Sequence, residues 1–153
     1  MLEEKINNDL KEAMKSKDAI RVSCLRMIIA GVKNASIAKQ KELKDEDIIE
    51  VLQKQLKQHK DSIEGFKKGN RQDLVDKESR ELEIIQSYLP EQLKPEEITN
   101  IVKEAVKETA AEGKKDMGKV MAAVMPKARG RADGKLVQKE VLEQLTKGQN
   151  KEQ

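Results

Sequence analysis

The sequence is poor in aromatic residues: its 153 residues include one Phe, one Tyr and no Trp. β-Sheets usually contain more aromatic and β-branched side chains, so this scarcity favours helices that pack on helices through Leu, Ile, Val, Ala and Met. It also argues against binding of single-stranded nucleic acid by stacking of bases on aromatic rings. Charged residues make up 39% of the chain and hydrophobic residues 37%, which leaves enough apolar material for one domain or two small ones.

Cysteine is scarce as well. Because Cys24 is the only cysteine, no disulfide can form within the chain, which indicates a reducing compartment. The first ten residues, MLEEKINNDL, are charged from residue 3 and lack the apolar stretch of a secretory signal. The most apolar stretch, 19–32, contains Arg21 and Arg26 and is too short to span a bilayer. We therefore expect a cytoplasmic protein that does not enter the membrane.

The net charge of +3 is small, but its distribution is uneven. The segment 114–135 carries seven basic and two acidic residues, so it has a charge of +5 while the remaining 131 residues sum to −2. The whole molecule therefore produces no strong field that indicates a nucleic acid or a membrane. Any anionic partner is expected to meet this one segment.

Apolar residues recur every three or four positions, which is the period of a helix, and no segment shows the alternation of a strand. Pro90 and Pro95 lie five residues apart, and the residue before a proline is disfavoured in a helix, so no helix can cross this stretch. The sequence predicts an all-α fold: a larger N-terminal helical domain (1–90), a boundary at 90–94, a small three-helix C-terminal domain (95–147) and a frayed tail (148–153).

Capping residues set the predicted helix ends. Asp18, Asp116 and Asp133 are placed to cap the N-termini of three helices. Gly69 and Gly113 are predicted to end two others. Pro95 suits the first position of a helix.

The residues that could carry chemistry are few. Cys24 and His59 both fall on apolar helix stripes, where packing is the ordinary role, and neither has an evident activating neighbour in the sequence. Glu81 and Glu83 are expected on an exposed helix surface. One His, one Cys and scattered carboxylates show no metal-ligand spacing. We expect no catalytic residues, no metal site and no cofactor.

The segment MPKARGRADGKLV, Met125–Val137, is the strongest candidate for binding. Its glycines allow a sharp turn with positive φ or a close backbone approach, and its arginines carry planar forks that match phosphate oxygens. The N–H groups that begin the last helix are further donors for an anion. An ordinary solvated turn is the alternative. The predicted RNA-binding residues are Lys119, Lys127, Arg129, Gly130, Arg131, Gly134 and Lys135.

Four stretches resemble the YqeY family of small bacterial proteins and together span nearly the whole chain: DAIRVSCLRMIIAGVKNA (18–35), RQDLVDKE (71–78), SYLPEQL (87–93) and MGKVMAAVMPKARGRADGKLV (117–137). The last stretch is also similar to the end of GatB, the subunit of the glutamine-dependent aspartyl/glutamyl-tRNA amidotransferase, where a G-x-V-M … K … G-x-A run closes the chain. Lys44 departs from the family pattern, because relatives tend to have Ser or Thr there as a helix cap.

The resemblance implies an all-helical fold with a larger N-terminal part and a three-helix C-terminal part. In GatB the tail engages tRNA while the chemistry lies elsewhere, so the resemblance implies a tRNA-binding accessory protein. Association with carbon–nitrogen ligase activity, with glutamine as amido donor, comes through this kinship alone. The alternative is a helical interaction module that docks on an amidotransferase or an aminoacyl-tRNA synthetase without touching RNA. A monomer is favoured.

Overall fold

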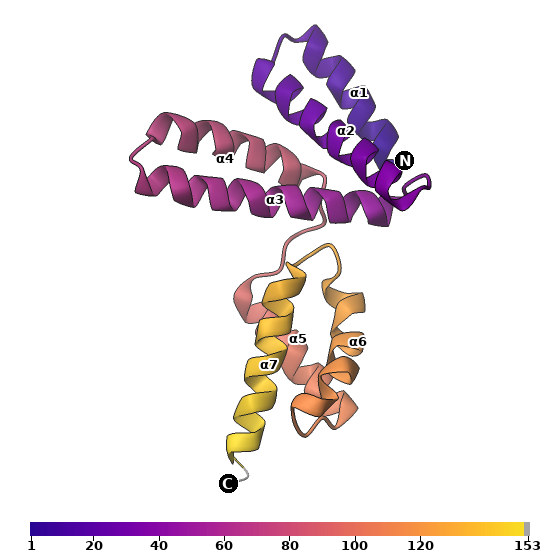
Figure 1. Ribbon diagram of the computed structural model, residues 1–153, viewed down its shortest axis with the longest axis vertical. Coiled ribbons are helices and arrows are strands. Elements are labelled where there is room, and N and C mark those ends of the chain that lie inside the picture. The colour runs from indigo at the N-terminus through magenta and orange to yellow at the C-terminus, as the bar shows by residue number, and fades with distance from the viewer. Residues whose placement is uncertain (152–153) are drawn as a thin grey trace. The chain divides into compact units, whose positions relative to one another are not determined.

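The computed structural model describes residues 1–151 and is helical almost throughout (Figure 1). Within these residues there are seven α-helices, one short 3₁₀ helix and no strand, which confirms the predicted all-α class. None of the helices in this part of the chain is both long and apolar enough to cross a membrane. The chain divides into two compact units, Met1–Pro90 (unit 1) and Glu91–Gln153 (unit 2), and each has a hydrophobic core of its own.

Unit 1 consists of two helical hairpins, in which α1 lies beside α2 and α3 beside α4 (Figure 1). The four helices are α1 (Leu2–Lys15), α2 (Ala19–Lys39), α3 (Asp45–Lys68) and α4 (Gln72–Ser87). Their apolar stripes meet in a core of aliphatic side chains. Its most buried large members are Ile6, Leu25, Ile28, Ile48, Leu52 and Ile85.

Local capping chemistry explains several helix ends in unit 1. The Asp18 carboxylate accepts a hydrogen bond from the Arg21 N–H at 3.2 Å and so caps α2 as predicted. Gly69 is the C-cap of α3, also as predicted. Lys44, the N-cap residue of α3, has no capping oxygen in its side chain. Instead the Asp47 carboxylate accepts from the Lys44 N–H at 3.0 Å, so this backbone donor is satisfied from inside the helix.

Unit 2 contains α5 (Pro95–Thr109), the 3₁₀ helix η1 (Lys114–Asp116), α6 (Met117–Ala128) and α7 (Gly134–Lys151). Pro95 begins α5, as its missing N–H and fixed φ favour. Side chains from all three α-helices form the core, and its fully buried members are Val102, Val120, Val124, Val137, Val141 and Leu145.

Three details of unit 2 differ from the sequence prediction. α5 ends at Thr109 with Ala110 in the left-handed conformation, four residues before the predicted stop at Gly113. The Asp116 side chain does not cap α6; it accepts a hydrogen bond from the Glu112 N–H at 2.9 Å, and this bond lowers the pKa of its carboxyl group. α6 continues through Pro126 to Ala128, although a proline inside a helix lacks an N–H donor and its ring crowds the carbonyl four residues before it.

The predicted frayed tail, 148–153, begins within α7, which extends to Lys151. Residues 152–153 of that tail lie outside the described residues.

Candidate functional site

The connection between α6 and α7 is a tight turn of five residues, 129–133. Gly130 adopts φ 78°, as its predicted role in a sharp turn requires, and it is buried. Its carbonyl accepts a hydrogen bond from Gln92 Nε2 at 2.9 Å. The turn is therefore held by the segment that begins unit 2.

Arg131 adds two further links to that segment. Its carbonyl accepts a hydrogen bond from the Leu93 N–H at 2.7 Å, and its side-chain Nε donates to the Glu91 carbonyl at 3.1 Å. The side chain is half-buried, so Arg131 is a structural residue of the turn as well as a cation. A guanidinium has five N–H donors, and the bond to Glu91 uses the one on Nε. The bond to Glu91 does not use the four N–H donors on the two terminal nitrogens.

Three other predicted cations lie at the same end of unit 2. Lys127 belongs to the last turn of α6 rather than to the link, and its Nζ lies 3.9 Å from Glu104 Oε2. Arg129 is the exposed C-cap of α6, and Lys135 is exposed in the first turn of α7. We define the turn surface as Lys127, Arg129, Arg131 and Lys135.

Lys119 lies apart from the turn surface. It stands in the first turn of α6, eight residues before Lys127, which corresponds to about 12 Å along the helix axis. Its Nζ lies 3.9 Å from Asp116 Oδ1. Lys119 can therefore meet the same ligand as the turn surface only if that ligand runs along α6.

The N-terminus of α7 offers less to an anion than the sequence suggested. Asp133 caps the helix as predicted, because its Oδ1 accepts from the Lys135 N–H at 3.0 Å. This carboxylate places a negative charge where a phosphate was expected to bind. Gly134 begins the helix, and among the described glycines Gly130 alone has positive φ. The side chains of the turn surface, rather than the helix N-terminus, carry the basic character.

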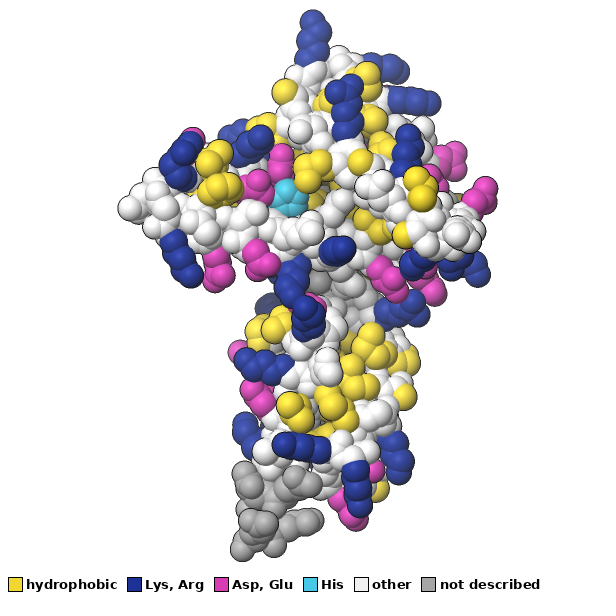
Figure 2. All heavy atoms as spheres, in the orientation of Figure 1, with side chains coloured by type: hydrophobic (Ala, Val, Ile, Leu, Met, Phe, Trp, Pro, Cys, Tyr) yellow, Lys and Arg dark blue, Asp and Glu magenta, His cyan; other side chains and the backbone are white. Residues whose placement is uncertain are grey.

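Apolar side chains also gather on unit 2, where Figure 2 shows a continuous group of them on the visible face. Within α6, Met117, Met121 and Met125 recur at every fourth position and are each half-buried. Methionine side chains are flexible and adapt to irregular partners. We call these three residues the methionine stripe; it is the candidate apolar contact surface of unit 2, as the turn surface is the candidate charged one.

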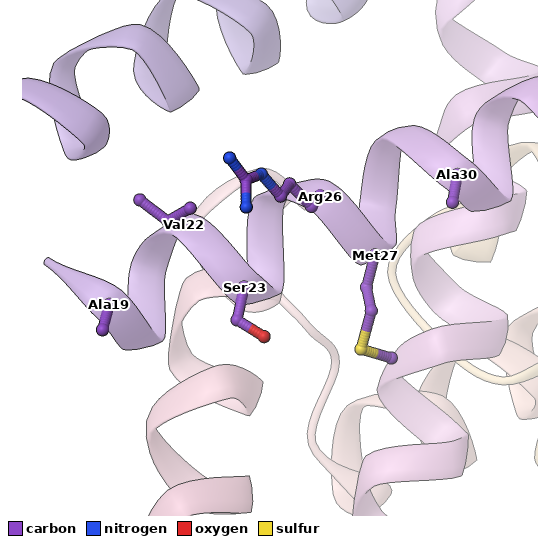
Figure 3. Close-up of a pocket in the computed structure, with 6 residues that line it drawn as sticks. All are labelled: Ala19, Val22, Ser23, Arg26, Met27 and Ala30. Carbon is purple, nitrogen blue, oxygen red and sulfur yellow. The ribbon is translucent and has the colours of Figure 1, made fainter.

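A shallow groove follows α2 in unit 1 (Figure 3). Its lining residues all come from this one helix, and they are Ala19, Val22, Ser23, Arg26, Met27 and Ala30. Small-molecule sites are concave and enclose most of their ligand. Because no second element supplies a wall, the groove is not the enclosed site that a substrate needs.

Unit 1 contains a polar cluster that the sequence did not reveal. His59 of α3 is buried, and its Nδ1 makes a direct contact with Glu78 Oε2 and lies 3.6 Å from Glu81 Oε2, both on α4. Glu81 is 4% exposed, so its expected position on an exposed surface was wrong. Burial, and then the charge of Glu78, raise the pKa of the Glu81 carboxyl. His59 thus has partners, which come from a helix nineteen or more residues further along the chain.

Cys24 lies beside this cluster but does not act as a nucleophile in this state. Its thiol is buried, as predicted, and Sγ donates to the Glu81 carbonyl at 3.6 Å. Burial, with the negative charge of Glu81, raises the pKa of the thiol to about 12. The thiolate is the reactive form of cysteine, so this side chain stays protonated at neutral pH.

Several known proteins are similar in sequence to part of this chain. Proteins named altered inheritance of mitochondria protein 41, mitochondrial, are 44% identical in Lachancea thermotolerans, 39% in Kluyveromyces lactis and 40% in Candida glabrata. The three matches cover 55%, 54% and 56% of this chain and 46%, 45% and 48% of the relatives. The chain thus spans about half the length of the curated relatives it matches.

These relatives contradict the expected cytoplasmic location, because all three are named as mitochondrial proteins. The prediction used a lone cysteine and the lack of an apolar leader. Both features argue against an oxidising compartment, but neither separates the cytoplasm from the interior of an organelle.

The family comparison covers much more of the chain than these relatives do. The match to the family described as Yqey-like protein extends over residues 3–145, through all but the first two residues of unit 1 and most of unit 2. It includes all but the first residue of α1, the whole of α2 to α6, the turn surface and the first two-thirds of α7. The chain therefore belongs to the Yqey-like protein family.

Proposed function

We propose that this protein is an RNA-binding accessory protein that holds structured RNA, tRNA in particular, by its phosphates on the turn surface. The observation that carries the proposal is the concentration of four cations around one turn whose backbone is fixed at Gly130 and Arg131. A fixed backbone lets several side chains meet successive phosphates without the entropic cost of ordering a loop.

The chemistry of the surface favours phosphate contacts over base reading. Arg129 and Arg131 present guanidinium groups, which bind phosphate oxygens through paired hydrogen bonds. Lys127 and Lys135 add point charges. The chain has one Phe and one Tyr, so stacking of splayed bases has little support. Recognition by shape and backbone, as for a folded RNA, is the mode that these residues support.

The acidic neighbours limit the affinity. Lys127 is paired with Glu104 at 3.9 Å, and Asp133 occupies the start of α7. An exposed ion pair contributes at most about 1 kcal/mol, so a phosphate can displace Glu104 at small cost. Binding should therefore be moderate and strongly dependent on salt.

The proposed role is service to an enzyme rather than catalysis in this chain. The resemblance of the turn region to the GatB tail supports a place beside tRNA amidation, with an amidotransferase or an aminoacyl-tRNA synthetase as partner. In that role the turn surface presents the tRNA, while the glutamine-dependent chemistry takes place on the partner.

A second candidate function is docking on a protein without RNA contact. The methionine stripe of α6, Met117, Met121 and Met125, favours it, because half-buried methionines suit an adaptable apolar interface. An interface of this kind depends on apolar burial, so salt weakens it little.

A binding comparison at low salt separates the two candidates. We expect Arg129→Ala combined with Lys135→Ala to weaken the binding of unmodified tRNA by at least about tenfold, since two phosphate contacts are lost. The charge-matched control is Lys67→Ala combined with Lys68→Ala, which removes two exposed lysines from the end of α3. The proposal is wrong if both pairs of substitutions weaken binding equally or if the parent protein does not bind tRNA. A partner that is captured from RNase-treated lysate and lost in Met121→Ser would then support docking.

A further inference from the structure

We propose that His59, Glu78 and Glu81 form a binding site for a divalent transition-metal ion between α3 and α4. Each residue offers one ligand atom, and the three atoms lie within 4.8 Å of one another. Glu78 and Glu81 are three residues apart on α4, so both carboxylates face α3, where His59 lies. This site is independent of the turn surface, which belongs to unit 2.

The spacing of the buried donors matches a metal-bound pair. Zn²⁺ binds nitrogen and carboxylate oxygen at about 2.0–2.2 Å in tetrahedral geometry, which separates two ligand atoms by about 3.3–3.5 Å. His59 Nδ1 and Glu81 Oε2 are 3.6 Å apart. This distance is long for a hydrogen bond, but it is close to the edge of a metal tetrahedron. Glu78 Oε2 contacts the same Nδ1 directly, so these two atoms must move apart when an ion takes the place of the proton between them.

Burial gives the second, independent argument. Glu81 is 4% exposed and His59 is 6% exposed. Among residues 1–151 no hydrogen bond reaches the Glu81 carboxylate, whose charge faces the His59 ring. A charge in this largely buried position is costly, and a cation bound between the two helices offsets that cost. Two carboxylates and one neutral imidazole suit a charge of +2.

An ion can reach the site from solvent. The Glu78 side chain is 20% exposed, and Figure 2 shows acidic side chains beside the chain's single histidine. Imidazole favours Zn²⁺ and its first-row neighbours over Mg²⁺ and Ca²⁺, which prefer oxygen ligands alone. Three protein ligands leave one tetrahedral position open for water. Zn²⁺ is therefore the probe, and Mg²⁺ is the control ion.

The test uses the full chain without a histidine tag, so that His59 is the only imidazole. Nuclear magnetic resonance of the ¹⁵N-labelled imidazole should show shifted ring-nitrogen signals with Zn²⁺ and unchanged signals with Mg²⁺. At a hundredfold excess over its dissociation constant, Zn²⁺ should raise the Tm by about 5–10 °C, because it joins α3 to α4.

Substitutions then assign the ligands. His59→Gln and Glu81→Gln should each lower the Zn²⁺ affinity in calorimetry by at least about tenfold. Loss of a residue that only hydrogen-bonds to a metal ligand already costs about that much, and loss of a ligand should cost more. Glu83→Gln, on the exposed side of α4, removes the same charge and should leave the affinity unchanged. Imidazole signals that do not respond to Zn²⁺ in the parent protein overturn the proposal, whether or not a variant folds. Equal affinity in the parent and in folded His59→Gln overturns it as well.

Discussion

Replacement of Arg131 by alanine tests whether the turn surface is rigid because of its own side chains. The substitution removes the hydrogen bond from Nε to the Glu91 carbonyl at 3.1 Å and leaves the backbone bond from Leu93 to residue 131 in place. A hydrogen bond from a charged donor contributes about 1.5–3 kcal/mol when it is shielded from water. Since this bond is exposed and water can replace it, we expect a loss of about 1 kcal/mol.

The loss should be concentrated at the start of unit 2. The Leu93 N–H, which donates to the Arg131 carbonyl, reports the local opening directly. A change of 1 kcal/mol makes its hydrogen exchange about fivefold faster. Arg131→Lys is the matched control, because it keeps the charge but lacks Nε. It should speed the exchange of Leu93 to a similar degree and retain most of the RNA affinity.

The reasoning is refuted if the Leu93 amide exchanges at the same rate in Arg131→Ala as in the parent protein. In that case the segment 91–93 is held without the Arg131 side chain. The Arg131 side chain would then be a solvated cation whose loss leaves stability nearly unchanged.

Two further predictions concern stability. Gly130→Ala should destabilise the protein by about 1–2 kcal/mol in urea unfolding, because φ 78° is unfavourable for a residue with a Cβ. Gly65→Ala lies in the interior of α3 with nothing within 4 Å of an added Cβ, and it should instead stabilise the protein by about 0.5–1 kcal/mol. Equal effects of the two changes would contradict the reasoning. The hydrogen bond from the Lys44 N–H, followed by the one from Lys39, lowers the pKa of Asp47 from 3.8 to about 2. Because the folded-state pKa is the lower one, the stability that Asp47 provides is present above pH 3.8 and is lost as the pH falls through about 2. Asp47→Asn should therefore destabilise the protein at pH 7 and have little effect on its stability at pH 2, as measured by urea unfolding at both pH values. A loss of unfolding free energy that does not depend on pH would show that the carboxylate charge does not cause it.

Features set by neighbouring residues could be predicted from the sequence. The caps Asp18 and Asp133, the stop at Gly69 and the start at Pro95 all depend on groups within a few positions of the helix end. The positive φ of Gly130 is of the same kind, because the sharp turn requires a residue without a Cβ. The all-α class could also be predicted, because helical periodicity depends on residues only three or four positions apart.

Features set by packing could not be predicted in this way. Glu81 looked like a solvated charge, because its burial depends on how α4 lies against α3 and α2. The same packing brings His59 to Glu78 and Glu81. The sequence predicted Arg131 only as an RNA-binding residue, and the path of residues 91–93 makes it a partner of the Glu91 carbonyl as well. Each case involves residues nineteen or more positions apart, beyond the reach of helical spacing.

The dependence of tRNA affinity on salt tests the central claim most directly. If each of the four cations of the turn surface contacts one phosphate, a plot of log affinity against log salt has a slope of about −3 to −4. Arg129→Ala combined with Lys135→Ala removes two contacts and should make the slope shallower by about 1.5. A parent slope near zero, or a slope that the double substitution leaves unchanged, would contradict phosphate binding by the turn surface.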